Sequence, residues 1–159
     1  MAAGSTYTPI ATTTLGSASA TVTFSSISSA YTDLVMIIQA TTAAGNAMTY
    51  QLNGDSTTTN YSVTGLFGDG SSAGSYRSSN NTLSGASAAP NVAILNFQNY
   101  SNTTTYKTLL SRGNEINNDT RAVVSLWRNT AAVNQIVMGI NGGTFATGST
   151  FTLYGIAAA

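Results

Sequence analysis

The chain has 159 residues, a formal net charge of zero at pH 7 and 6% charged residues. A chain of this length folds as one domain around a single core, and its five Lys and Arg residues are spread along the sequence, whereas a nucleic-acid-binding protein needs them clustered. Cysteine is absent, which excludes a disulfide framework and a thiolate metal site.

The first ten residues, MAAGSTYTPI, lack the basic segment and apolar run of a secretory signal. We expect residues 1–12 to form an N-terminal arm or an edge strand, followed by a single domain over residues 13–159. The longest aliphatic run, residues 34–38, is far shorter than the roughly 20 apolar residues that cross a bilayer. We therefore expect a protein that is made in a cytoplasm and has no membrane partner.

Apolar and polar residues alternate along most of the chain, which is the pattern of strands that bury one face. Turn-forming clusters of Gly, Asn, Asp and Ser separate these runs. In chain order, the apolar positions of the runs are Ala18, Ala20, Val22 and Phe24; Met48, Tyr50 and Leu52; Ala93, Leu95 and Phe97; Ala122, Val124 and Leu126; and Phe151 and Leu153.

Two segments depart from this alternation. The run LVMII at residues 34–38 is apolar on both faces, which predicts a central strand covered on each side. Residues 67–84, FGDGSSAGSYRSSNNTLS, are poor in apolar residues and are expected to form an exposed excursion. No stretch has the apolar repeat of a helix. The spacing predicts an all-β fold of eight to ten short strands in a sandwich or barrel.

Residues 51–61, QLNGDSTTTNY, contain a Gly-Asp-Ser that suits several kinds of site. A serine nucleophile at Ser56 needs a neighbouring base, but the chain has no His and Lys107 is its single Lys. The acidic residues show no spacing that predicts a glycosidase pair. These acidic residues are Asp33, Asp55, Asp69, Glu115 and Asp119.

A calcium loop and a turn are the other two interpretations of this segment. Asp55, Asp69 and Asn53 offer oxygen ligands for calcium but lack the regular spacing of a dedicated loop, and the sequence leaves calcium binding open. Asn and Gly adopt positive φ readily, so Asn53 and Gly54 after a strand favour a hairpin corner. The Asp55 and Ser56 side chains would then accept backbone N–H bonds. We expect the corner, and no catalytic residue, cofactor or metal site.

Several motifs resemble a family of small virion proteins of tailed bacteriophages, common among marine and cyanobacterial phages. The resemblance covers about residues 30–156, although Gln51 and Leu52 stand where family members often have Arg and Phe. Its most specific elements are Asn53-Gly54-Asp55-Ser56 with Asn60-Tyr61, Asn102 with Lys107, Trp127 with Asn129-Thr130, and Gly148-Ser149-x-Phe151-x-Leu153-Tyr154-Gly155.

The resemblance implies a jelly-roll-like antiparallel β-sandwich with a non-enzymatic structural role in the virion. Two functions fit this role. In the first, the protein is a capsid decoration, or cement, protein on the exterior of the head, with the major capsid protein as partner. In the second, it is a tail-fibre or head-fibre tip that binds a host surface glycan through aromatic faces. Candidates for such exposed aromatic surface are Phe67, Tyr76, Tyr100, Tyr106 and Trp127.

Self-association is expected for either function. A small β-sandwich must shield its edge strands by charge, proline or a partner, and this chain has one Lys and two Pro residues. We therefore expect a homo-oligomer, a trimer by analogy with the family. Residues 2–10 are expected to be a flexible arm that becomes ordered on a neighbouring protein.

Overall fold

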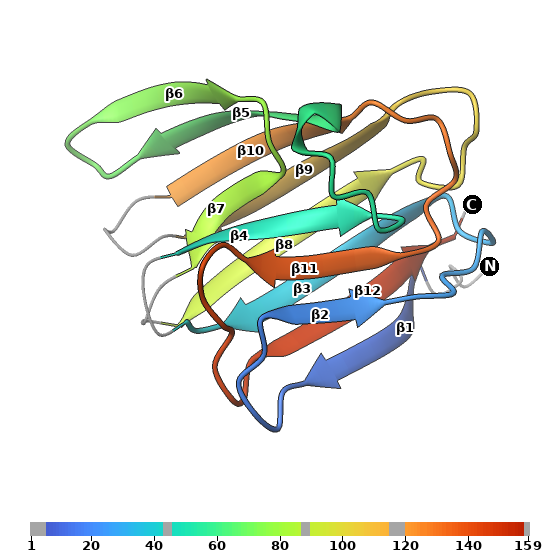
Figure 1. Cartoon of the computed structure of the whole chain (residues 1–159), viewed down its shortest axis with the longest axis horizontal. Helices are drawn as coiled ribbons and strands as arrows, with labels where there is room; N and C mark the ends of the chain where they lie inside the picture. The colour runs from blue at the N-terminus through green and yellow to red at the C-terminus, as the bar shows by residue number, and fades with distance from the viewer. Residues whose placement is uncertain (1–5, 43–45, 87–89, 115–119, 158–159) are drawn as a thin grey trace.

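The computed structural model describes residues 6–42, 46–86, 90–114 and 120–157. Within them, twelve strands form two antiparallel sheets that pack face to face (Figure 1). The large sheet has the order β1 (Tyr7–Thr14), β12 (Thr150–Ile156), β3 (Asp33–Ala40), β8 (Asn91–Gln98), β9 (Lys107–Asn114), β10 (Thr120–Trp127), β5 (Tyr61–Gly68) and β6 (Ala73–Ser78). The small sheet has the order β2 (Thr21–Phe24), β11 (Ile136–Ile140), β4 (Asn46–Leu52) and β7 (Thr82–Ala86).

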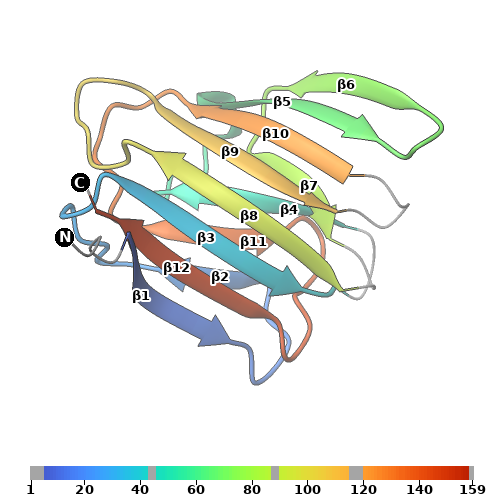
Figure 2. The ribbon, with the colours of Figure 1, turned by 180° about the vertical axis from the view of Figure 1, so that it is seen from behind.

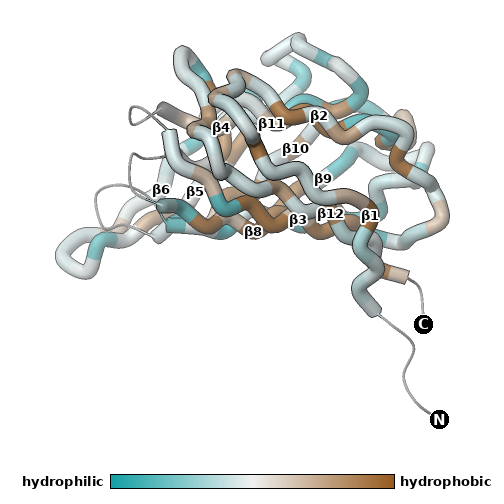
Figure 3. The backbone as a smooth tube through the Cα atoms, turned by 90° about the horizontal axis from the view of Figure 1, so that it is seen from below, coloured by the Kyte–Doolittle hydropathy of each residue, from teal (hydrophilic) through white to brown (hydrophobic). Residues whose placement is uncertain are grey.

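This architecture confirms the expected all-β, jelly-roll-like sandwich, with twelve strands in place of eight to ten. The chain crosses repeatedly between the two layers, which are seen edge-on in Figure 3. A short 3-10 helix at Thr58–Asn60 lies on one such crossing. The core fills the space between the layers, where apolar side chains of both inner faces interdigitate.

Most of the predicted inward faces are confirmed. Met48, Tyr50 and Leu52 of β4 are buried, and so are Phe151 and Leu153 of β12. The inward positions of β8 are buried as well. These are Ala93, Leu95 and Phe97.

The predicted face of β10 is wrong. Val123 and Trp127 point into the core, whereas Val124 is 52% exposed. The indole of Trp127 is the largest side chain of the strand and buries the most apolar area, so it determines which alternate positions face inward. Ala122, Val124 and Leu126 consequently lie on the opposite face.

The prediction for β3 is confirmed on one face. Leu34, Met36 and Ile38 are buried in the core, and β3 lies between β12 and β8. Of the described residues, however, no strand or helix covers the other face of the large sheet (Figure 2). Val35 on that face is buried among its neighbours in the sheet, but Ile37 is partly exposed. This uncovered surface is termed the outer face below.

Residues 67–84 are mostly exposed or partly exposed, as predicted, but they contain strands that the sequence did not reveal. The strand β5 ends at Gly68, a turn closed by Asp69 leads into β6, and β7 begins at Thr82. Their polar composition places them at sheet edges, where one side of each strand faces solvent. Both β6 and β7 are edge strands.

At the N-terminus, Tyr7–Thr14 forms the edge strand β1, which pairs with β12. This strand includes part of the expected arm and extends across the expected boundary at residue 13. Residues 1–5 lie outside the described residues. Among the residues that are described, no helix is long and apolar enough to span a membrane.

Candidate functional site

Asn53 and Gly54 form a tight turn that carries the chain from the small sheet to the large one. Their φ angles are +52° and +72°, as in a turn of type I′, and the Asp55 N–H donates to Leu52 O at 3.0 Å. The predicted hairpin is nevertheless wrong, because β4 lies in the small sheet and β5 in the large one. The turn residues were predicted correctly, but the residue types of a turn do not determine whether the next strand joins the same sheet.

The Asn53 side chain fastens this corner to the loop that precedes β11. Its Nδ2 donates to Ala132 O at 2.8 Å, and its Oδ1 accepts the N–H groups of Asn134 and Gln135 at 2.9 and 3.2 Å. One amide thus satisfies three backbone groups that belong to no strand. Asn53 is a structural residue of the corner.

The Asp55 carboxylate accepts three N–H groups. Oδ1 accepts the backbone N–H of Thr57 at 2.9 Å, and Oδ2 accepts Asn60 Nδ2 at 2.9 Å and Trp127 Nε1 at 2.8 Å. Partial burial acts to raise the pKa of Asp55, but these hydrogen bonds outweigh it and hold the pKa below its ordinary value. The carboxylate therefore anchors the buried indole of β10 to the corner.

Tyr61 completes the arrangement beneath the corner. Its hydroxyl donates to Asp55 O at 2.9 Å and accepts the Leu52 N–H at 3.1 Å. Its ring stacks on Trp127 with centroids 6.4 Å apart and meets Tyr50 edge-on at 5.3 Å. Burial raises the pKa of Tyr61 to about 12. We call Asn53, Asp55, Asn60, Tyr61 and Trp127 the corner cluster.

The remaining motifs of the middle of the chain are also structural. Lys107 is buried, and its Nζ donates to Thr105 O at 2.8 Å and Thr130 O at 3.1 Å. Asn102 Oδ1 accepts the N–H groups of Thr104 and Thr105 at 2.7 and 2.9 Å. These bonds join two loops at the end of the sandwich that carries the corner cluster.

The geometry does not support the enzymatic and calcium interpretations of Gly-Asp-Ser. Ser56 is exposed, and its hydroxyl has no hydrogen-bond partner among the described residues. Asp55 and Asp69 lie at opposite ends of β5, whose eight residues span about 25 Å, too far apart for a shared calcium ion or for a glycosidase pair. Glu115 and Asp119 lie outside the described residues.

Each of these carboxylates is also occupied by donors. Asp69 accepts the N–H and hydroxyl groups of Ser71 and Ser72, which hold its pKa well below the usual range. A cation site needs oxygen atoms directed at an empty centre. Across the described residues, no group of three or more acidic side chains provides one.

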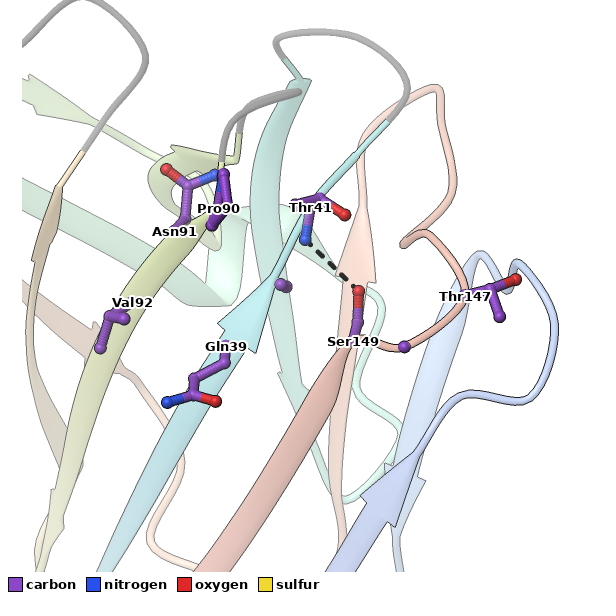
Figure 4. Close-up of a pocket in the computed structure, with 9 residues that line it drawn as sticks. Gln39, Thr41, Pro90, Asn91, Val92, Thr147 and Ser149 are labelled. Carbon is purple, nitrogen blue, oxygen red and sulfur yellow. Dashed lines mark hydrogen bonds between the residues drawn. The ribbon is translucent and has the colours of Figure 1, made fainter.

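A pocket of about 370 Å³ opens where the ends of β3 and β8 meet the turn before β12 (Figure 4). The Thr41 N–H donates to Ser149 Oγ at 3.3 Å on its wall. Gln39, Pro90, Val92 and Thr147 are among the other lining residues. The lining has no ionisable side chain, so it supplies no acid or base.

The aromatic candidates have different environments. Tyr100 and Trp127 belong to the core, whereas Tyr106 is exposed. Phe67 and Tyr76 are partly exposed on the end of the β5–β6 hairpin, where Arg121 Cζ lies 5.6 and 5.9 Å from the two ring centroids. These three aromatic residues at the surface are the ones available to a ligand.

A larger feature, which sequence reasoning missed, is the apolar character of the outer face. Five of the six most exposed large apolar side chains lie there, and the sixth is Tyr106. Four of them alternate with buried residues of their own strands. The fifth, Tyr7, lies against Tyr154 of the neighbouring strand β12. The five are Tyr7, Leu66, Val92, Leu110 and Val124.

The signal for this face was present in the sequence. Residues 122–127, AVVSLW, are apolar at every position of one alternating register and at two of the three positions of the other, so either choice of inward face leaves apolar side chains outside. No protein-family model matches the chain, and no curated protein is significantly similar to it.

Proposed function

We propose that this protein is a non-enzymatic structural protein of a bacteriophage virion, a capsid decoration protein that binds on the exterior of the head. The observation that carries the proposal is the concentration of Leu66, Val92, Leu110 and Val124 on one uncovered sheet face. Contiguous exposed apolar surface marks sites of protein association. The resemblance in the motifs supplies the virion context.

The contrast between the two sheets supports an association role. The outward residues of the small sheet are mainly polar, with Thr21 and Thr23 on β2 and Thr49 and Gln51 on β4. The small sheet therefore presents mainly polar residues to solvent. The large sheet also carries outward threonines such as Thr64 and Thr108, so its exposed apolar side chains form a patch on the outer face.

A decoration protein acts by binding the assembled shell. Anything that binds the assembled state alone stabilises it by mass action. The proposed activity is thus association with copies of itself and with the major capsid protein, and it needs no reactive side chain. The corner cluster contributes by holding the two sheets together beneath the interface.

The experiment compares virions that lack this protein with complete virions. Complete particles should survive heat and osmotic shock better, and immunogold labelling in negative stain should decorate the head. Equal robustness of the two particles, or label confined to the tail, would overturn the decoration role.

A receptor-binding tip is the second candidate, favoured by the exposed Tyr106 and by the half-exposed Phe67 and Tyr76 beside Arg121. Aromatic faces of this kind stack on sugar rings. Particles that lack the protein would then be intact and equally robust, but would fail to adsorb to cells. Substituting Tyr106 by Ala would reduce adsorption under this alternative and leave it unchanged for a decoration protein.

A further inference from the structure

Two polar side chains at the centre of the outer face have no hydrogen-bond partner among the described residues. Asn96 on β8 is partly exposed, and Arg112 on β9 is exposed. Both line a groove of about 380 Å³, together with Asp33 of β3. An Arg and an Asn left unpaired on an apolar surface require partners when that surface is covered.

The sheet register relates these three residues by symmetry. Asn96 pairs with Val35 on one side and with Leu110 on the other. Asp33 lies two residues before Val35, and Arg112 lies two residues after Leu110. Because β3 and β9 both run antiparallel to β8, they run in the same direction. Asp33 therefore lies one strand and two residues away from Asn96, and Arg112 lies one strand and two residues away in the opposite direction.

We propose that a second copy of this chain covers the outer face, related to the first by a two-fold axis that lies in the interface and passes over Asn96. An axis perpendicular to the line from Asp33 to Arg112 places Arg112 of one copy against Asp33 of the other, twice. Asn96 then faces Asn96 of the second copy, and an amide is complementary to itself because it carries both donors and an acceptor.

Charge complementarity thus selects a second copy as the occupant. Asp33 Oδ1 already accepts the Asn99 N–H at 2.6 Å, so its other oxygen is available to an arginine. A guanidinium and a carboxylate that are both removed from water need such a match. A two-fold contact is isologous, so one pair of residues on the face satisfies both interactions.

Part of the apolar surface of the face is covered by the same operation. With strands about 4.8 Å apart and residues about 3.4 Å apart, the rotation brings Ile94 over Val35 and Tyr154 of the second copy. With this axis the strands of the two copies cross at about 70°, and strands of about seven residues then overlap over about 600 Å², the lower end of what each partner buries in a specific complex. A trimer has no two-fold axis, so this contact specifies a pair of chains.

Cross-linking of the full-length chain tests the axis, because the protein has no cysteine of its own. Asn96→Cys should give a covalent dimer with a bis-maleimide short enough to join thiols on facing sheets about 10 Å apart. Thr64→Cys is the matched control, because it is exposed on the same face but lies three strands away from Asn96, and the rotation leaves its two copies about 17 Å apart along the face. Equal cross-linking of the two variants would overturn the proposed axis.

Charge exchange tests the Asp33–Arg112 pairs by sedimentation equilibrium. The wild-type chain should be a dimer at micromolar concentration, and Arg112→Asp or Asp33→Arg should each weaken it at least tenfold, while the double exchange restores it. Arg77→Asp on the edge strand β6 makes the same change of charge and should leave the dimer intact. A monomeric wild type, or singles and double exchange that behave alike, would overturn the proposal.

This inference adds the contact between copies to the proposed function. A dimer that forms in solution but is absent from virions would leave the inference standing and remove the decoration role. Circular dichroism of each variant shows whether a loss of dimer follows from unfolding. If Asp33→Arg fails to fold, Arg112→Asp and the cross-linking still test the proposed two-fold contact.

Discussion

Replacing Asp55 by Asn should reveal how much the corner cluster contributes to stability. Asn keeps the shape of the side chain but has one acceptor oxygen in place of two. If that oxygen serves Trp127 and Asn60, the new NH₂ group faces the Thr57 N–H, and one of three hydrogen bonds is lost. A hydrogen bond to a charged group contributes about 1.5–3 kcal/mol and a neutral one about 1 kcal/mol. Losing one bond and weakening two should cost at least about 2.5 kcal/mol.

Urea unfolding at pH 7, followed by Trp127 fluorescence, measures this cost directly, since Trp127 is the single Trp. Asp69→Asn is the control, because it makes the same substitution in an exposed turn, where solvent weakens the hydrogen bonds to Ser71 and Ser72, and its unfolding midpoint should fall by less than that of Asp55→Asn. The pKa of Asp55 is lowered from 3.8 in the folded state, so its contribution is complete above that pH and is lost as the pH falls through the folded pKa. An Asp55→Asn midpoint equal to wild type at pH 7 would refute the reasoning.

Five further substitutions test the fold. Leu153→Ala should cost about 2–5 kcal/mol in urea unfolding, because the side chain is fully buried; an unchanged midpoint would contradict its burial. Ser56→Ala should change stability by less than about 1 kcal/mol, whereas Gly54→Val should destabilise the corner because its φ is +72°; any esterase activity lost with Ser56 would reverse our interpretation. Gly65→Ala should lower the melting temperature because a Cβ there would lie 2.3 Å from the Tyr76 ring, and Tyr76→Ser in the same chain should remove that penalty.

The fold class followed from the sequence because its signal is local. Alternation with a period of two identified β4, β8 and β12 and their inward faces, since polar residues interrupt the other face of each strand. The strands within the exposed excursion at residues 67–84 were missed for the opposite reason. Edge strands such as β6 have few apolar residues to bury, so their backbone pairing with β5 leaves little trace in the pattern.

The corner cluster could be predicted only in part. The residue types of Asn53 and Gly54 indicate a turn wherever they occur. Their partners come from residues 127–135, more than 70 positions away, and no local pattern specifies such a pairing. The aromatic stack of Tyr61 on Trp127 is a consequence of β5 pairing with β10, which is a property of the topology.

The misassigned face of β10 bears directly on function. Consistency between local pattern and global fold is the rule in a foldable sequence, and departures from it concentrate at functional sites. Burying Trp127 forces Val124 outward, beside Leu110 on the adjacent strand. A threonine at this position would keep the strand propensity and remove the exposed apolar surface. The valine at this position is therefore part of the exposed apolar surface on which the proposed association rests.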